Sequence, residues 1–251
     1  MRACSLPAHG NCEKYICGQK GHVRGMSTFK IAIDGPAGAG KSTIAKAAAS
    51  KMGIVYVDTG AMYRAIGLAA VRAGVDHDKD IKGVEALLPD INVEIAHSKT
   101  GQIVYLNGED VSTEIRLPEV SVAASDVSRI PSVRAKLLEL QRGLAEKTDV
   151  IMDGRDIGTV VLPDAQLKIF LTASVEERAM RRYKELVEKG IECDFDEVKK
   201  DMEYRDKNDS EREIAPLKPA DDSVIVDTTN NDLDESVERI MQIINERRKS
   251  I

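Results

Sequence analysis

The chain has 251 residues, 42% of them hydrophobic and 31% charged, which suits a globular protein with one substantial core. The net charge of −6, the absence of Trp and an aromatic content of 4% argue against a surface that binds nucleic acid or anionic membranes. No apolar run approaches the roughly 20 residues that cross a bilayer. We therefore expect a cytoplasmic protein with neither nucleic-acid nor membrane partners.

The first 25 residues are polar and Gly-rich and lack a periodic apolar pattern. They hold three of the four cysteines and two of the four histidines, namely Cys4, Cys12, Cys17, His9 and His22. A small metal-binding knot is one interpretation, although the spacing matches no familiar zinc pattern. We prefer the alternative that residues 1–25 are a disordered or artefactual extension, with a single domain at residues 26–251, since Met26 shortly precedes the first predicted strand. That domain contains only Cys193, as expected in a reducing compartment.

A strand, a glycine-rich loop and a helix are predicted in succession near the start of this domain. Residues 29–34 form a short apolar run, residues 35–42 match the pattern G-x-x-x-x-G-K-[ST], and residues 44–49 are strong helix formers. In this context the glycines let backbone N–H groups converge on phosphate oxygens at the start of a helix. An ordinary Gly-rich turn is the alternative, but it does not require the full spacing with both flanks.

We predict that this loop binds ATP. The predicted contacts are nine consecutive residues: Gly35, Pro36, Ala37, Gly38, Ala39, Gly40, Lys41, Ser42 and Thr43. Lys41 is expected to reach the outer phosphates, and Ser42 or Thr43 to hold Mg²⁺.

A second apolar run, residues 54–58, leads into a helical pattern that ends before Gly74. Alternating strands and helices predict an α/β fold with a parallel sheet, in which ligands bind at the carboxyl ends of the strands. Asp58, Thr59 and Arg64 follow the second strand, so we expect them to face the same crevice as the glycine-rich loop. The alternative is that Thr59 caps the helix and Arg64 is a surface charge.

Residues 86–125 contain a different pattern, which predicts a small antiparallel insertion. Two strand-like runs, residues 91–95 and 103–106, are separated by turn-forming residues, and the second is followed by Asn107-Gly108. Nothing in this stretch indicates metal or nucleophile chemistry.

Two helices are predicted after the insertion, at residues 120–128 and 131–147. They carry Ser125, Arg129 and Arg134, which either point into the crevice or serve as capping and surface groups.

An apolar strand at residues 150–153 closes with Asp153, where phosphoryl transfer calls for a carboxylate on the Mg²⁺ side. Arg155 and Asp156 follow at once and either reach the crevice or form a structural ion pair. Apolar runs at residues 167–171 and 223–227 complete a sheet of five predicted strands.

The segment of residues 178–215 is rich in charges of both signs. Its arginines include Arg178, Arg181, Arg182, Arg205 and Arg212. A pair of solvated helices is the plain interpretation. The alternative is a lid, whose arginines neutralise a transferring phosphoryl group and whose closure excludes water.

These features favour a small kinase over other nucleotide-binding classes. The guanine-reading pattern Asn-Lys-x-Asp is absent, and the chain is short for a motor or transporter ATPase. The supply of arginine favours an acceptor that carries a phosphate, because such an oxygen is already anionic near pH 7 and needs no base. A non-catalytic nucleotide-sensing module is the alternative from another class.

Four motifs, at residues 33–43, 58–64, 153–161 and 205–209, resemble those of the bacterial cytidylate kinase family. The resemblance implies a P-loop NTPase-type sheet flanked by helices, with a nucleoside-monophosphate lobe that contains the insertion and a helical lid over residues 178–215. It also implies that the chain uses ATP and Mg²⁺ to phosphorylate CMP and dCMP. A kinase for a different nucleotide is the alternative within this class, and we expect a monomer.

The resemblance assigns roles to individual residues. The residues implied to hold the acceptor phosphate are Arg64, Arg155 and Arg212, which with Lys41 form the expected catalytic set. Those implied to read the base are Ser125, Arg134 and Asp156. Those implied to contact the sugar are Thr59, Arg205 and Asp209. Ser42 and, through water, Asp153 are the expected Mg²⁺ residues. An ionised Asp156 accepts from the amino group of cytosine and rejects uracil, which presents a carbonyl there.

Overall fold

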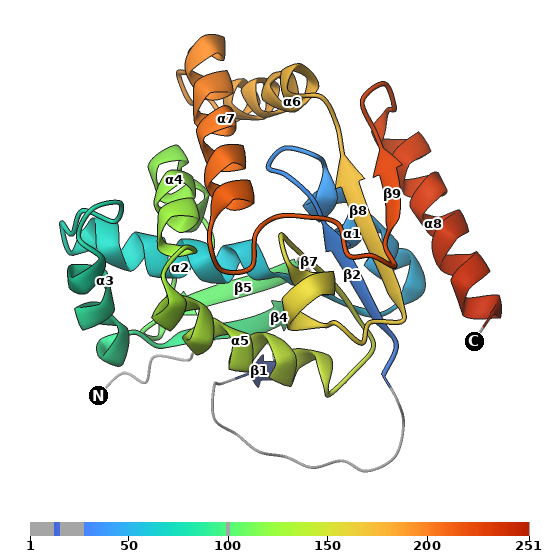
Figure 1. Cartoon of the computed structure of the whole chain (residues 1–251), viewed down its shortest axis with the longest axis horizontal. Coiled ribbons are helices and arrows are strands. Elements are labelled where there is room, and N and C mark those ends of the chain that lie inside the picture. Colours follow the sequence, from blue (N-terminus) through green and yellow to red (C-terminus); the bar gives the residue numbers. More distant parts are fainter. Residues whose placement is uncertain (1–12, 16–27, 99–100, 251) are drawn as a thin grey trace, which may run out of the picture.

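The computed structural model describes residues 13–15, 28–98 and 101–250. At its centre five strands form a parallel sheet in the order β3-β7-β2-β8-β9 (Figure 1). The strands are β2 (Lys30–Asp34), β3 (Val55–Asp58), β7 (Val150–Gly154), β8 (Leu167–Thr172) and β9 (Val224–Asp227). The prediction of a five-stranded parallel α/β sheet is therefore confirmed. Within the described residues no helix is long and apolar enough to cross a membrane.

Helices cover both faces of this sheet. One face packs on α1 (Lys41–Met52) and α8 (Leu233–Lys249), and the other on α2 (Thr59–Arg72), α4 (Pro118–Val127) and α5 (Pro131–Ala145). The alternation of side chains along β2 explains both cores, because Ile31 and Ile33 join the first and Ala32 joins the second. A strand that is buried on both faces has a continuous apolar sequence, as residues 29–34 do.

The predicted insertion supplies three strands of an antiparallel sheet in the order β1-β4-β5-β6, and the fourth, β1, comes from the N-terminal part of the chain. The strands are β1 (Glu13–Tyr15), β4 (Val93–Ser98), β5 (Gly101–Leu106) and β6 (Glu109–Asp110), and the last three follow the short helices α3 (Ile81–Leu87) and η1 (Leu88–Asp90). The turn after β5 has positive φ at both Asn107 (51°) and Gly108 (85°), as a two-residue hairpin turn requires.

Strand β1 corrects part of one expectation. We expected no regular structure over residues 1–25, yet Glu13–Tyr15 pairs with Ile95, Ala96 and His97 of β4. β4 pairs with β5 on one side only, so the backbone N–H and C=O groups of its other edge are available to a further strand. The cysteines and histidines considered for a metal knot lie outside the described residues, and no metal-binding cluster occurs within them.

The insertion is fixed to the main sheet through Gln102 of β5. Its Oε1 accepts from the backbone N–H of Asp58 at 2.9 Å, and its Nε2 donates to the Asp58 carbonyl at 3.1 Å. One amide thus pairs with the backbone at the carboxyl end of β3 as a neighbouring strand would. The insertion therefore supports the point from which Asp58 caps α2.

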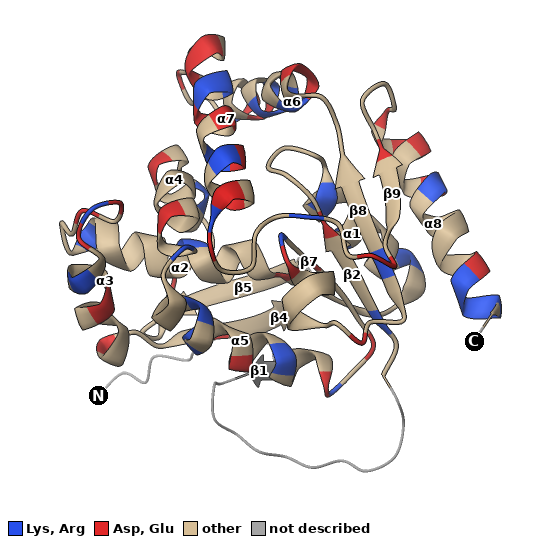
Figure 2. Cartoon of the chain, in the orientation of Figure 1, with Lys and Arg blue, Asp and Glu red and all other residues tan. Residues whose placement is uncertain are grey.

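Two charged helices, α6 (Val175–Glu188) and α7 (Phe195–Glu211), stand beyond the carboxyl end of β8, and α7 lies against α4 (Figures 1 and 2). Arg178 of α6 is only 4% exposed, and its guanidinium donates to the carbonyls of Ala173 (2.8 Å) and Ala37 (3.0 Å) and pairs with Asp206 of α7 (2.7 Å). The helix pair is thus anchored on the glycine-rich loop at one buried arginine. The prediction that it moves as a lid stays a prediction.

Gly35 gives a first testable prediction. A Cβ there would overlap the carbonyl oxygen of Leu171 on β8, and the φ of 148° is one that L side chains rarely adopt. Gly35→Ala is therefore expected to lower the free energy of unfolding by about 3 kcal/mol or more, since backbone cannot move aside cheaply. Gly53→Ala, with φ 67° and no neighbour within 4 Å, should cost only about 1 kcal/mol. Equal losses in urea unfolding would contradict this argument.

Candidate active site

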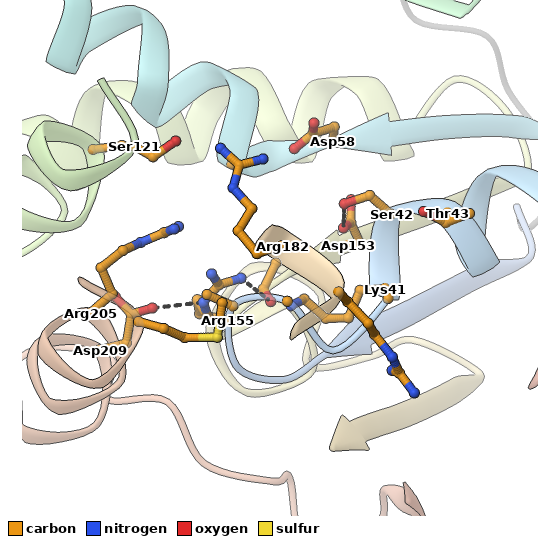
Figure 3. A pocket seen from close by; sticks show the side chains of 18 of the residues that line it. Lys41, Ser42, Thr43, Asp58, Ser121, Asp153, Arg155, Arg182, Arg205 and Asp209 are labelled. Atoms are coloured by element: carbon orange, nitrogen blue, oxygen red, sulfur yellow. Dashed lines mark hydrogen bonds and ion pairs between the residues drawn. The ribbon is translucent and has the colours of Figure 1, made fainter. Parts of the chain in front are cut away.

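One cavity of about 710 Å³ lies at the carboxyl ends of β3 and β7 beside the glycine-rich loop, and it is the setting for nearly all predicted site residues (Figure 3). The predicted residues in its wall are Ala37, Gly38, Gly40, Lys41, Ser42, Thr43, Thr59, Arg64, Ser125, Asp153, Arg155, Asp156, Arg205, Asp209 and Arg212. Arg134 lies behind Asp156 and contacts it. Five segments that are far apart in sequence thus meet at one site.

The glycine-rich loop has the backbone that phosphate binding requires. Gly38 (φ 72°) and Gly40 (φ 84°) are left-handed, and α1 begins at Lys41 without a side-chain cap. Its first N–H groups are thus left for an anion, which the helix dipole favours. Lys41 is 5% exposed, and its Nζ donates to the Pro36 carbonyl at 2.6 Å. Burial, and then the charge of Arg155, lower the pKa of Lys41 to about 7, an effect that a bound phosphate would oppose.

Ser42 and Asp153 form the arrangement expected of a Mg²⁺ site. Ser42 Oγ donates to Asp153 Oδ2 at 2.7 Å, and the hydroxyl of Tyr56 donates to Oδ1 at 3.0 Å. Burial, and then the negative charge of Asp58, raise the pKa of Asp153 to about 6. Hydroxyl and carboxylate oxygens are the donors that Mg²⁺ prefers, and a cation would relieve the cost of burying this carboxylate, so these residues fit the ion.

Three predicted arginines project into the same cavity. Arg64 pairs with Asp58 at 2.7 Å, Arg155 pairs with Asp209 at 2.7 Å, and Nε atoms of Arg64 and Arg205 are buried without a hydrogen-bond partner. Burial, and then the charge of Arg155, lower the pKa of Arg205 to about 10. Clustered guanidiniums with unused donors indicate a site for an anion such as a phosphate.

Asp156 is the centre of a buried ion cluster. It is 4% exposed, and its two carboxylate oxygens separately accept from Arg134 and, at 3.1 Å, from Arg212. Arg212 also donates to Ser128 Oγ at 3.1 Å and to the Ala215 carbonyl at 2.6 Å. Arg212 thus contacts Asp156, a predicted base-reading residue, while it lines the same cavity as Arg64 and Arg155, and its expected contact with the acceptor phosphate stays a prediction. The sequence alone could not indicate this contact, since Arg212 lies at the end of the same helix, α7, that carries Arg205.

Ser125 and Thr59 are both hydrogen-bonded to protein groups at the site. Ser125 Oγ donates to Asp209 Oδ1 at 3.2 Å, so a predicted base-reading residue contacts a predicted sugar contact. Thr59 Oγ1 donates to the Asp153 carbonyl at 2.7 Å, which ties the end of β7 to the start of α2. Both residues line the cavity, and Thr59 keeps a lone pair there for a ligand donor.

Sequence reasoning missed Asp34, the last residue of β2. Its carboxylate is 4% exposed and accepts from the backbone N–H groups of Ile157 and Gly158, both at 2.7 Å. These residues open the π-helical turn η3 (Ile157–Val161) that directly follows Asp156. Asp34 thus holds the turn beside Asp156 against the strand that leads into the glycine-rich loop. An acid that closes a buried strand was the available signal.

Asp34 gives a pH-dependent prediction. Burial raises its pKa from the ordinary 3.8 to about 6, so the folded protein binds a proton between these values that the unfolded chain does not. Stability from this group therefore rises as the pH falls through about 6, and its ionisation opposes folding at neutral pH by about 3 kcal/mol. We expect thermal unfolding at about pH 7 and pH 5 to show that the Tm of the wild type, relative to that of Asp34→Asn, is higher at the lower pH. A difference in Tm between the two proteins that is the same at both pH values would contradict this prediction.

Comparison with known proteins agrees with this geometry. A family model described as cytidylate kinase matches residues 31–246. The cytidylate kinase of Geobacillus sp. (strain WCH70) is 50% identical over 221 residues, which cover 88% of this chain and 98% of that protein. Two further cytidylate kinases resemble this chain to a similar degree. That of Lactobacillus johnsonii is 51% identical over 222 residues, which cover 88% of this chain and 96% of that protein. That of Caldicellulosiruptor saccharolyticus is 49% identical over 218 residues, which cover 87% of this chain and 96% of that protein. The chain therefore belongs to the cytidylate kinase family.

Proposed function

We propose that the protein transfers the γ-phosphoryl group of ATP to CMP or dCMP and so produces ADP with CDP or dCDP. The observation that carries this proposal is the position of a buried, arginine-paired Asp156 in the same cavity as the glycine-rich loop. A triphosphate site and a carboxylate suited to an amino-bearing base thus share one enclosure. Membership of the cytidylate kinase family supports the same substrate pair.

The acceptor in this reaction is a phosphate oxygen that is already anionic, so the protein need not supply a base. Its task is to hold two anionic groups in line and to stabilise the charge that spreads over the transferring group. Arg64 and Arg155 are suited to the acceptor phosphate, and Lys41 to the outer phosphates of ATP. Arg182 of α6 lines the same cavity and adds a further cation from the lid side.

Ser42 and Asp153 would hold the Mg²⁺ that accompanies ATP. The ion supplies charge neutralisation between the phosphates when it is bound. The Ser42 hydroxyl donates to one oxygen of Asp153, and the Tyr56 hydroxyl donates to the other. The two hydroxyls therefore fix the orientation of the carboxylate.

Base selection follows from the Asp156 cluster. Cytosine presents an amino donor at N4, which an ionised carboxylate accepts, and acceptors at N3 and O2, which Arg134 or Arg212 can satisfy by donation. Uracil presents a carbonyl in place of the amino group and a donor at N3. The buried carboxylate, an acceptor, would then face the uracil carbonyl, and a guanidinium, a donor, would face the N3–H group. These unpaired groups disfavour UMP strongly.

A coupled assay that measures ADP formation with CMP, dCMP, UMP and AMP tests the proposal. CMP or dCMP is expected to be the best acceptor, and a clear preference for UMP or AMP would overturn it. ATP binding without ADP formation from any monophosphate would favour the non-catalytic module instead. We also keep the predictions that the protein is a monomer and acts in the cytoplasm, which light scattering and cell fractionation test.

A further inference from the structure

Asp126 is a buried carboxylate that lies outside the cavity wall and has no place in the mechanism above. It is 1% exposed on α4. Its Oδ1 accepts from the Tyr204 hydroxyl and from Asn208 Nδ2, both at 2.9 Å, and its Oδ2 lies 2.8 Å from Nδ1 of His77. We call these four residues the Asp126 cluster. It joins the loop after α2, helix α4 and helix α7, which are distant in sequence.

On α7, the two donors of the cluster directly precede the two predicted sugar contacts in the chain. Tyr204 and Asn208 are four residues apart on one side of α7, and Arg205 and Asp209 follow each of them directly. Residues four apart lie on the same helix face, so fixing the first pair sets the rotation of the second. On α4, likewise, Asp126 directly follows Ser125, whose hydroxyl donates to Asp209 at 3.2 Å.

Two adjacent contacts thus join the same pair of helices. The contact between Ser125 and Asp209 is in the cavity wall, where a ligand can replace it. The contact of Asp126 with Tyr204 and Asn208 is behind that wall and does not depend on a ligand. Hydrogen bonds to a charged, buried acceptor are among the stronger ones, so this second contact is able to hold α7 in place.

We propose that Asp126 is a positioning residue, which sets the rotation of α7 on α4 and thereby aims Arg205 and Asp209 at the acceptor nucleoside. This inference rests on the proposed function for the identity of that nucleoside. It does not make Asp126 a catalytic residue, because its side chain is not in the cavity wall. It predicts that loosening the cluster weakens binding of the acceptor and leaves binding of ATP intact.

The double variant Tyr204→Phe, Asn208→Ala removes both donors from α7 and leaves Asp126 in place. We expect KM for CMP to rise about tenfold, the scale of one hydrogen bond to a charged group, with KM for ATP within about twofold of wild type. The matched control is Ser210→Ala, since the Ser210 hydroxyl donates to carbonyls within α7 and, among the described residues, to no other element. The control is expected to match wild type. A double variant with unchanged KM for CMP, or with equal losses for both substrates, would overturn the proposal.

A double-mutant cycle separates positioning from simple stabilisation of the fold. If the cluster acts through Asp209, adding Tyr204→Phe and Asn208→Ala to Asp209→Ala should raise KM for CMP little further, whereas additive losses would refute this route. Hydrogen exchange keeps the test independent of the proposed function. Amides of α7 are expected to exchange faster in the double variant whichever nucleotide is the substrate, and unchanged exchange would overturn the positioning role. Wild-type protein that does not phosphorylate CMP would defeat the proposed function alone.

Discussion

Replacing Asp156 by alanine is expected to lower kcat/KM for CMP by about 10³-fold and to change the affinity for ATP little. The carboxylate accepts from both Arg134 and Arg212, and all three side chains are more than nine-tenths buried. Its removal takes away the acceptor for the amino group of cytosine and leaves two guanidiniums without their shared counter-ion. Steady-state kinetics with CMP, together with ATP titration of the free protein, measures both quantities.

The same substitution should also lower stability, because breaking a buried ion cluster leaves uncompensated charge that costs about 3–5 kcal/mol. Asp156→Asn keeps the volume and one acceptor oxygen, so it separates loss of fold from loss of base recognition. Asp164→Ala is the matched control, since Asp164 also pairs with a cation, Lys30, but is 67% exposed. If Asp156→Ala reduced ATP affinity as much as kcat/KM for CMP, Asp156 would be a general structural residue and the base-reading assignment would be wrong.

The parts of the fold that sequence predicted are those with a local signal. The apolar run before Gly35, the helix formers after Ser42 and the Asn107-Gly108 turn each specify a conformation through residues that are neighbours in the chain. Five parallel strands followed from the alternation of such runs with helical patterns. β1 had no comparable signal, because a three-residue edge strand depends on the strand that it joins.

Contacts between side chains that are far apart in the sequence could not be predicted from local sequence patterns. The sequence placed Arg212 near the site but not on Asp156, which is 56 residues away, and it gave no indication that Asp34 holds the turn beginning at Ile157. The contact of Asp34 depends on the pairing of β2 with β7, and that of Arg212 depends on where the end of α7 lies against the end of β7. Asp126 was missed for the same reason, as its partners on α7 are about 80 residues away. Motifs identify residue types, and the packing of helices decides which of them meet.

Lys41→Met is expected to reduce kcat by about 10²–10³-fold, the usual cost of removing one preorganised donor from a developing charge. Lys41 is the first residue of α1 and lines the cavity beside Ser42 and Arg155. Methionine fills a similar volume without the charge, so the loss should appear in kcat more than in KM for CMP. The matched control is Lys51→Met at the exposed end of the same helix, for which kinetics like those of wild type are expected.

Stability is expected to respond to Lys41→Met in the opposite direction from activity. Burial lowers the pKa of Lys41 from 10.5 to about 7, so the folded protein binds its proton less tightly than the unfolded chain does. This side chain therefore opposes folding wherever the unfolded lysine is charged: the penalty is complete below about pH 7, falls as the pH rises toward 10.5, and is still largely present at about pH 8. Methionine removes that net penalty, in which the attraction of Asp153 and Asp34 for the lysine is already counted, and it gives up the hydrogen bond to the Pro36 carbonyl, a contribution of about 1 kcal/mol. A Tm equal to or above that of wild type, measured at about pH 8, is therefore expected of an inactive enzyme. A lower Tm would mean that Lys41 supports the fold of the loop, and the loss of activity in the variant could then not be assigned to lost contacts with the phosphates.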